Sequence, residues 1–317
     1  MTDNSCVPYH VPVLLSKSID ALNVHQGGTY VDVTYGGGGH SDEILRRLQG
    51  NGRLFALDQD ADAIARGCQR RKTNNDNTQL YATPLQLIRS NFRYLWQWMR
   101  YYDVESVDGI LADLGVSSHH FDTAERGFSF RSDAPLDMRM NRQAPLTAAQ
   151  VLNTYSEQQL CNIFRLYGEL HNAHRLAAAV VRQRSQSPIE TTYQLVDIAD
   201  SMMRGDRRKQ ELAKVFQALR IEVNSEMEAL SSLLTAAARL LRPGGRLVVI
   251  TYHSLEDRLV KLFLRSGNIE GRIAEDIYGN RQTPFDTQRG KVVVPSEEEQ
   301  QNNPRSRSAK MRVGIKK

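Results

Sequence analysis

Cysteine is scarce in this sequence, and its few copies are scattered. The chain has three cysteines, Cys6, Cys68 and Cys161, and no Cys-x-x-Cys pair. A disulfide framework or a structural zinc site needs clustered thiols, often with histidines at short spacing. The composition therefore excludes a disulfide-rich secreted scaffold, predicts free thiols in a reducing compartment, and gives no reason to expect a metal.

Long apolar runs are also missing. No run approaches the roughly 18 consecutive apolar residues that a membrane-spanning helix needs, and the N-terminus lacks the charged start and apolar stretch of a secretion signal. No internal repeat is visible. We therefore expect a cytoplasmic protein with no membrane partner.

Length and positive charge are what the sequence does have. Its 317 residues suffice for one large or two ordinary domains. The apolar fraction of 40% and the charged fraction of 24% are typical of a folded globular protein. The net charge of +5 and the isoelectric point of about 9.1 favour a polyanionic partner.

The most informative stretch covers residues 29–58, where a strand of alternating valines leads into a glycine loop, a helix and a second strand. Gly36–Gly39 form the loop, and Ser41 is expected to cap the helix that follows. The second strand ends in Asp58, 22 residues after Gly36. In a nucleotide-binding βαβ unit, an acid at about this distance reaches the ribose hydroxyls.

Two cofactor classes use this geometry, and the glycines help to separate them. A dinucleotide site needs a third glycine under the pyrophosphate, but the matching position here is Ser41 or Asp42, depending on which glycine is counted first. Asp42 and Glu43 would also repel a pyrophosphate at the helix N-terminus. S-adenosylmethionine has a ribose, no phosphate and a positive sulfonium, so the acid-flanked loop suits it better. The alternative is a tight turn that binds nothing, which the entropy cost of four glycines disfavours.

Two later strands also end in polar residues. The apolar strand 107–112 leads into Asp113, and the strand 246–252 leads into His253, which begins a helix. Open α/β sheets bind ligands at the carboxyl ends of their strands, so we expect Asp113 to face the same crevice as the glycine loop. The alternatives are a turn-capping role for Asp113 and a helix-start role for His253.

The middle of the chain lacks a strand pattern. Residues 147–217 read as consecutive helices, among them one that starts with a capping-box pattern at Ser156–Gln159. We therefore predict an α/β protein whose sheet domain comprises residues 1–118 and 216–317, with a helical domain inserted at residues 119–215.

Basic residues collect in two irregular segments. Residues 126–142 contain Arg139 with Phe128 and Phe130 interleaved, as in single-strand binders. The last thirteen residues, from Arg305, hold six basic side chains and no acid. We expect these segments to position RNA by phosphate contacts; the alternative is a solvated surface with internal Asp–Arg pairs.

Trp96 and Trp98 lie on a predicted helix that opens at Asn91 and Phe92. Both indoles could stack on nucleobases. Because large aromatics more often fill a core or cover a surface, we interpret Trp96 as core and Trp98 as surface cover.

Eight motifs, in order along nearly the whole chain, resemble the bacterial ribosomal RNA cytosine-N4 methyltransferases of the MraW type. The motifs are His10–Leu15, Gly36–His40, Asp113–Ser118, Glu125–Phe130, Leu136–Met140, Phe216–Arg220, His253–Arg258 and Asn303–Arg305. The resemblance implies a class I methyltransferase with a Rossmann-like central sheet, an inserted all-helical substrate-recognition domain and S-adenosyl-L-methionine as cofactor. The implied target is a cytosine in the decoding region of small-subunit 16S rRNA.

The resemblance also implies roles for individual residues of the cofactor site. Gly38, Gly39 and His40 would hold the methionine end, in the loop that Gly36 begins, and Asp58 would hold the ribose. The other implied contacts are Phe92 along the adenine, Asp113 in the cofactor crevice, and His120. At His119 and His120 family members often carry proline and glutamine.

The implied chemistry constrains the site. The N4 lone pair of cytosine is delocalised into the ring, so the amino group must pyramidalise while acceptors hold its hydrogens at near-attack distance. Many amino-methylating enzymes use an Asn/Asp/Ser-Pro-Pro-Tyr turn for this, but here the corresponding turn is Asp113-Leu114-Gly115. Asp113 and nearby backbone carbonyls are therefore the catalytic candidates, and Arg139, His253 and Arg305 are the candidates for substrate binding. The target base must leave any stack to reach them.

Two other function classes fit the same sequence. One is a methyltransferase that acts on a protein or a small molecule, and the other is an RNA-binding module that senses a nucleotide without turnover. Product analysis separates the first from an rRNA methyltransferase. RNA binding without methyl transfer would identify the second.

Overall fold

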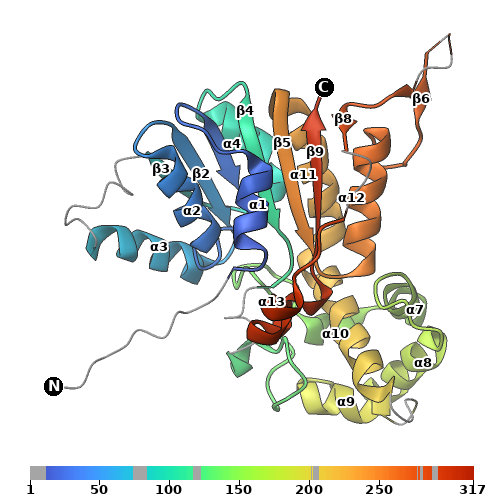
Figure 1. The fold of residues 1–317 in the computed structure, drawn as a ribbon. Helices are drawn as coiled ribbons and strands as arrows, with labels where there is room; N and C mark the ends of the chain where they lie inside the picture. The colour runs from blue at the N-terminus through green and yellow to red at the C-terminus, as the bar shows by residue number, and fades with distance from the viewer. Residues whose placement is uncertain are drawn as a thin grey trace. The chain divides into compact units, whose positions relative to one another are not determined.

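The protein is described by a computed structural model that covers residues 12–73, 84–116, 123–200, 202, 207–276, 278, 281–287 and 292–317. The chain divides into two compact units (Figure 1). The first comprises Met1–Gly115 and Glu228–Lys317, and the second Val116–Met227. The expected boundary at residues 215/216 falls inside helix α10 (Arg208–Asn224), whereas the second unit ends at Met227.

A seven-stranded sheet forms the centre of the first unit, in the order β3-β2-β1-β4-β5-β9-β8. Its strands are β1 (Thr29–Asp32), β2 (Arg53–Asp58), β3 (Leu85–Arg89), β4 (Val107–Asp113), β5 (Leu241–Thr251), β8 (Phe285–Asp286) and β9 (Lys310–Lys316). Strands β1 to β5 pair in parallel, while β9 runs antiparallel to β5, and β8 antiparallel to β9. This arrangement confirms the Rossmann-like α/β sheet expected from the sequence. Two short strands, β6 (Ala274–Glu275) and β7 (Arg281–Gln282), pair separately.

Alternate residues of the central strands face opposite layers of helices, as the two-residue period of a strand requires. Val31, Phe55 and Ile110 belong to one core cluster, which includes helices α4, α11 and α12. Their neighbours Tyr30 and Leu54 belong to another, which includes helices α1 and α2. Because both faces are covered, these strands are almost continuously apolar, as in buried parallel sheets generally.

Helix α1 of the first unit precedes these strands, and the other helices lie between strands in the chain (Figure 1). They are α1 (Leu15–Leu22), α2 (Gly39–Leu48), α3 (Ala61–Thr73), η2 (Phe92–Tyr94), α4 (Leu95–Tyr101), α11 (Glu226–Leu240, which starts in the second unit), α12 (Ser254–Ser266), α13 (Glu297–Asn302) and η6 (Pro304–Ser308). Ser41 lies inside α2 and does not cap it, because the helix starts at Gly39 after a left-handed Gly38. Asn224, an amide residue of the kind that often caps a helix start, does not cap α11 but is the last residue of α10.

The second unit is helical in its described residues. Its helices are η3 (Ala124–Arg126), α6 (Ala148–Thr154), α7 (Glu157–Leu166), α8 (Ala173–Arg184), α9 (Thr192–Asp200) and α10. Its own core contains Phe164, Val180 and Leu219, all fully buried. Capping boxes at Thr147 and Ser156 fix the starts of α6 and α7, as the sequence indicated for Ser156.

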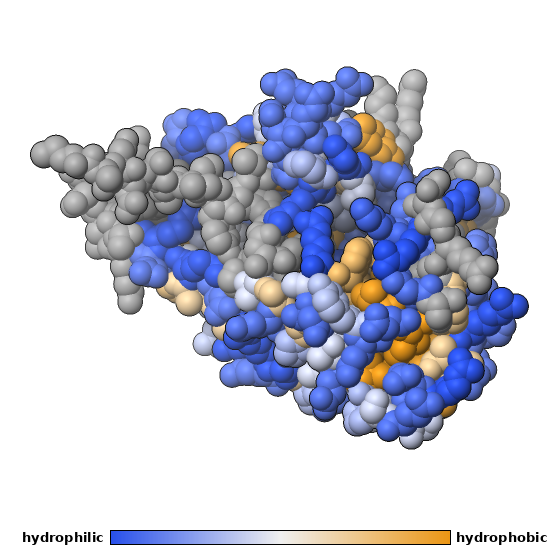
Figure 2. Space-filling model, turned by 90° about the horizontal axis from the view of Figure 1, so that it is seen from below, coloured by the Kyte–Doolittle hydropathy of each residue, from blue (hydrophilic) through white to orange (hydrophobic). Residues whose placement is uncertain are grey.

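Two further expectations concern strands and membranes. Residues 80–83, whose run Leu80-Tyr81-Ala82-Thr83 predicts a strand, lie outside the described residues; β3 begins at Leu85. Within the described ranges, no helix is both long and apolar enough to cross a membrane. Hydrophilic residues cover most of the face shown in Figure 2, where apolar residues gather in one area.

Candidate functional site

The carboxyl ends of four neighbouring strands carry polar side chains in the first unit. Strand β2 ends in Asp58, β1 in Asp32 and β4 in Asp113, and Tyr252 follows β5. Because these strands are parallel and adjacent, their ends meet along one edge of the sheet. This edge is where open α/β sheets bind ligands.

The buried Asp32 carboxylate connects the end of β1 to neighbouring elements by hydrogen bonds. It is 1% exposed, and its Oδ2 accepts the Ser41 hydroxyl at 2.7 Å, while its Oδ1 accepts the Thr34 backbone N–H at 3.0 Å. The Thr34 hydroxyl oxygen in turn accepts the backbone N–H of Asp113 at 2.7 Å. This chain of bonds ties the end of β4 to the glycine loop and helix α2. Burial raises the pKa of the Asp32 carboxyl, although these hydrogen bonds lower it.

The glycine loop turns tightly from β1 into α2. Gly36 and Gly38 both have left-handed backbones, with φ of 52° and 85°, a conformation that other residues adopt only with strain. At Gly39 a Cβ atom would lie 2.3 Å from Cγ of Pro12. Glycine is thus required here by the close approach of the protein's own chain.

Asp58 closes the loop onto β2. Its Oδ2 accepts the Gly36 backbone N–H and its Oδ1 accepts the Asp60 backbone N–H, both at 2.8 Å. A carboxylate has about four lone-pair positions, so these two bonds do not by themselves exclude the hydroxyls of a ribose. The structure therefore gives Asp58 a loop-holding role in addition to the ribose contact, which stays a prediction.

Phe92 lies on η2, directly after β3. The Asn91 side chain accepts the Arg93 backbone N–H and donates to Oε1 of Gln59 at 2.8 Å. This bond joins the segment of Phe92 to the loop that follows Asp58. The Phe92 ring is partly buried against the core. The residue expected to contact the adenine therefore lies on a segment that is bonded to the predicted ribose site.

Asp113 lies among side chains rather than backbone donors. Its Oδ1 accepts the Tyr252 phenol at 2.7 Å, and its Oδ2 lies 3.8 Å from Nδ1 of His40. The Asp113 side chain is 19% exposed. Burial raises the pKa of its carboxyl to about 6, an effect that His40 and Tyr252 oppose and that Asp32 and Glu256 reinforce. At neutral pH the carboxylate is therefore mostly ionised but close enough to its pKa to exchange protons.

Tyr252 and His40 are held in place by further contacts. Burial and the neighbouring Asp113 raise the pKa of the Tyr252 phenol well above its usual value. The phenol therefore stays protonated and donates a hydrogen bond to Asp113. Nε2 of His40 lies 3.2 Å from the Val13 carbonyl oxygen. The ring is thus held between the Val13 carbonyl oxygen and the Asp113 carboxylate.

His253 has the helix-start role that the sequence offered as its alternative. It is the N-cap of α12, where its Nδ1 accepts the Glu256 backbone N–H and Glu256 accepts the His253 backbone N–H. Its ring is 7% exposed, with Nε2 at 3.1 Å from Oε1 of Glu256. Substrate binding by His253 stays a prediction.

The predicted RNA-contacting arginines differ in their surroundings. Arg139, in the second unit, forms a two-pronged pair with Asp137 at 2.9 and 2.7 Å and donates to the Ala144 carbonyl oxygen at 2.7 Å. Such an internal Asp–Arg pair was the alternative reading of this segment. Arg305 is exposed on η6 of the first unit. Phosphate binding by either residue stays a prediction.

The structure thus assembles most of the sequence-predicted cofactor residues at one edge of the sheet. Gly36, Gly38, Gly39, His40, Asp58 and Asp113 come together there. His120 lies outside the described residues. The sequence analysis missed Tyr252 as a partner of Asp113, although its position after the strand next to β4 was a usable signal.

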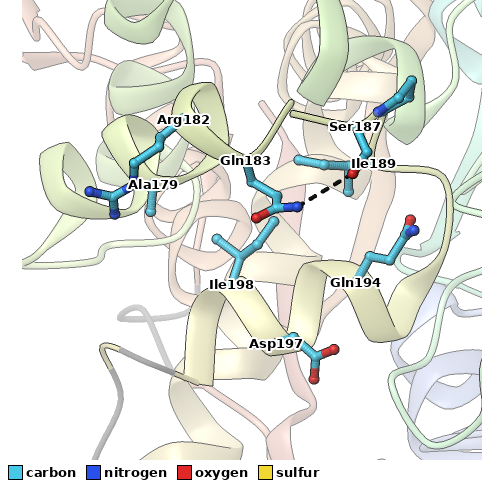
Figure 3. Close-up of a pocket in the computed structure, with 9 residues that line it drawn as sticks. Ala179, Arg182, Gln183, Ser187, Ile189, Gln194, Asp197 and Ile198 are labelled. Carbon is cyan, nitrogen blue, oxygen red and sulfur yellow. Dashed lines mark hydrogen bonds between the residues drawn. The ribbon is translucent and has the colours of Figure 1, made fainter. Parts of the chain in front are cut away.

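A hollow in the second unit contains none of these residues. It has a volume of about 380 Å³ and lies between α8 and α9, where Gln183 and Ile198 face one another (Figure 3). The Gln183 side chain donates to the Ser187 hydroxyl at 3.4 Å. Nothing in this hollow resembles the acidic edge of the sheet.

Comparison with known proteins identifies relatives of the whole chain. The model of the MraW methylase family matches residues 8–317. A protein of Bacteroides thetaiotaomicron is 57% identical over 309 residues, which cover 98% of each chain. One of Parabacteroides distasonis is 52% identical over 315 residues, 99% of this chain and 98% of the other. Both relatives are named ribosomal RNA small subunit methyltransferase H.

Proposed function

The chain belongs to the MraW methylase family, and from that premise we propose that it methylates the exocyclic N4 of a cytosine in the decoding region of small-subunit 16S rRNA. The methyl donor is S-adenosyl-L-methionine. The names of the relatives support small-subunit rRNA as the substrate. The observation that carries the chemistry is the Asp113 carboxylate, fixed by Tyr252 at the carboxyl end of β4.

The residues at the sheet edge fit a cationic nucleoside cofactor. The edge carries Asp58 and Asp113, and the nearest guanidinium to the glycine loop, that of Arg70, is already paired with Asp42 and the Gly37 carbonyl. A phosphate would meet carboxylates here, whereas a ribose and a sulfonium would meet acceptors. When bound, the cofactor supplies an electrophilic methyl group. Asp58 would hold its ribose, Phe92 its adenine, and the loop Gly38–His40 its methionine end.

Asp113 is suited to orient the amino group and to take its proton. Its Oδ1 is engaged by the Tyr252 phenol, so Oδ2 is the oxygen that can accept from N4. A base with a pKa slightly below neutral is ionised before the reaction and still able to receive a proton. Once on Oδ2, that proton would face Nδ1 of His40.

Proton acceptance by Asp113 completes the chemistry without the Pro-Pro-Tyr turn of many amino methyltransferases. The sequence has Asp113-Leu114-Gly115 in that place. The Leu114 N–H donates to the Ile250 carbonyl oxygen at 2.9 Å, which holds the turn against β5. An ordered turn of this kind keeps the acceptor in one position and so favours the near-attack geometry.

Positively charged side chains would position the RNA substrate. We propose that Arg139, Arg305 and His253 contact RNA around the target, with the basic residues from Arg305 to the C-terminus on its phosphates. A ribosomal substrate also places the activity in the cytoplasm. The target cytosine must leave its stack to reach the sheet edge.

Transfer of a labelled methyl group to small ribosomal subunits from cells that lack the protein tests this proposal. Nucleoside mass spectrometry of the product rRNA should show N4-methylcytidine, and Asp113→Asn should lose the product. Label in a protein or a small molecule would instead support the first competing class. RNA binding with no transfer at any cofactor concentration would support the second.

A further inference from the structure

Helix α4 carries an aromatic stripe that the proposed chemistry does not use. Tyr94, Trp98 and Tyr101 follow one another at i, i+4 and i+7, so they share one face of the helix and of the turn before it. Tyr94 is 48% exposed and Tyr101 73% exposed. Large aromatics that gather on a surface indicate a binding face more often than scattered ones do. We call these three residues the α4 stripe.

Two rings of the α4 stripe, those of Trp98 and Tyr101, pack against each other and against Tyr102. Trp98 meets Tyr101 edge to face, with centroids 5.7 Å apart, and lies nearly parallel to Tyr102 at 6.2 Å. Tyr101 also meets Tyr102 edge to face at 5.1 Å. Such mutual packing leaves the outer faces of the rings open while restricting their rotation. A partner that stacks on Tyr101 therefore pays little side-chain entropy.

Arginines surround the α4 stripe. Within the described part of the chain, Arg53, Arg100 and Arg239 form no ion pair and no side-chain hydrogen bond, and each is exposed. Two of these guanidinium groups lie near aromatic rings: Arg53 is 6.0 Å from the centroid of Phe55, a neighbour of Tyr102, and Arg239 is 5.9 Å from that of Trp96, on another face of α4. A cation beside an aromatic face is a common arrangement in proteins that bind nucleic acids.

Acids are fewer than arginines in this region. The region comprises residues 84–105 with Arg53 and Arg239; its charged residues are Arg53, Arg89, Arg93, Arg100, Asp103, Glu105 and Arg239. Five of these are basic and two acidic, and the acids follow the end of α4. A polyanion would thus be attracted, whereas a second copy of the chain, docked about a two-fold axis, would bring arginines against arginines.

We infer that the α4 stripe and its arginines form an accessory RNA-binding surface, on which unpaired bases stack and phosphates meet Arg53 and Arg100. This inference rests on the proposed function, because rRNA is the partner it assigns. Arg53 begins β2 and Asp58 ends it, so the Arg53 end of the surface lies about 17 Å from the crevice at roughly 3.3 Å per residue, while Tyr94 lies two residues after Phe92. The RNA bound at the Arg53 end is therefore a segment other than the target cytosine.

The test compares KM for small ribosomal subunits between the wild-type enzyme and the double variant Tyr94→Ala/Tyr101→Ala. Both side chains are exposed, so the fold should be kept, which circular dichroism can check. Loss of base stacking should raise KM about 10-fold. The variant Tyr94→Ala/Tyr101→Trp keeps a stacking ring at position 101 and should recover most of the affinity that the double alanine variant loses. Arg53→Gln/Arg100→Gln should flatten the dependence of log Kd on log salt concentration by about one to two units.

Controls separate this inference from the proposed function. Tyr278→Ala removes an 83% exposed tyrosine from another surface of the same unit and should leave KM as it is. An unchanged KM and salt dependence in the α4 variants, with rRNA methylated normally, would overturn the surface and leave the function standing. A wild-type enzyme that methylates no rRNA would overturn the function, and filter binding of 16S rRNA by the same variants would still decide the surface. A wild-type dimer that the α4 variants dissociate would show that a second copy binds there instead.

Discussion

Asp58 and Asp113 hold equivalent positions in the sheet and yet have opposite surroundings. Each ends a parallel strand that is paired with β1, one on either side. Asp58 accepts two backbone N–H groups, those of Gly36 and Asp60. Asp113 instead accepts the Tyr252 phenol and faces the His40 imidazole.

The difference indicates how two acids at one edge of a sheet can have different roles, one in binding and one in catalysis. Both of these donors to Asp58 are backbone groups of loops, so the hydrogen bonds fix the shape of the glycine loop and of the turn into α3. The partners of Asp113 are side chains that can gain or lose protons or be replaced one at a time. Burial raises the pKa of Asp113 to about 6, near the range where a general base works at neutral pH. Asp58 is thus suited to hold a ligand and Asp113 to react.

The sharpest test of this division is Asp113→Asn, which keeps the shape and removes the charge. Turnover should fall by roughly 10²-fold or more, the scale for a lost general base or oriented acceptor. Cofactor affinity should change much less. Single-turnover methylation at saturating cofactor measures the step, with Asp58→Asn as the matched control that should mainly weaken cofactor binding. A wild-type rate in Asp113→Asn would make Asp113 structural, and His253 would be the next residue to replace.

Asp58→Ala should show the reverse pattern. Loss of the ribose contact should weaken S-adenosylmethionine binding by about 1.5–3 kcal/mol, as for hydrogen bonds to charged groups. Because Gly36 and Asp60 also lose their acceptor, the free energy of unfolding should fall by about 1–3 kcal/mol. Calorimetry gives the first quantity and urea denaturation the second. Unchanged affinity in a folded variant would remove Asp58 from the cofactor site.

The sequence predicts Asp58 and Asp113 better than it predicts their partners. Strand patterns and the glycine loop locate β1, β2, β4 and β5, because a short apolar run that ends in a polar residue is a local property of the chain. The bond between Tyr252 and Asp113 joins residues 139 positions apart, and only the pairing of β4 with β5 brings them together. Ser41 illustrates the same limit: its position suits a helix cap, but tertiary structure gives its hydroxyl to Asp32.

Local sequence patterns also do not predict strands of mixed polarity or the side-chain contacts of loops. β3 (Leu85–Arg89) buries only Leu85 and Ile88 and contains a glutamine and an arginine, so its sequence carries little strand signal. Arg139 looked like a phosphate ligand, and only the fold showed that Asp137 and the Ala144 carbonyl occupy its guanidinium. Charge in a sequence therefore identifies candidate phosphate ligands, while the fold shows which protein groups a phosphate would have to compete with; phosphate binding by Arg139 stays a prediction.

The raised pKa of Asp113 should also appear in stability. A carboxyl whose pKa is about 6 in the folded protein, against an ordinary value of 3.8, binds its proton more tightly when folded. Its ionisation therefore destabilises the fold progressively as the pH rises from about 4 through 6. Asp113→Asn lacks this effect, so its free energy of unfolding relative to wild type should rise by about 1 kcal/mol from pH 5 to pH 8. Urea titrations at both pH values measure it; a pH-independent difference would mean that Asp113 is not the buried titrating group.

The smallest expected effect, and the most specific, belongs to Tyr252→Phe. The phenol donates to the ionised carboxylate and so lowers the pKa of Asp113. Removal of one hydrogen bond of about 1 kcal/mol should raise that pKa by about half to one unit. The single-turnover rate, which needs ionised Asp113, should then reach its midpoint at a pH higher by that amount, with a several-fold loss near pH 6 and little loss at pH 8.

His40, Asp32 and Glu256 also face Asp113 and stay in place in this variant, so the shift isolates the phenol. The double variant Asp113→Asn/Tyr252→Phe should show no midpoint in this range at all. A midpoint that Tyr252→Phe leaves where it was would mean that another group limits the rate. The acid at the end of β4 would then serve, like Asp58 at the end of β2, to hold rather than to react.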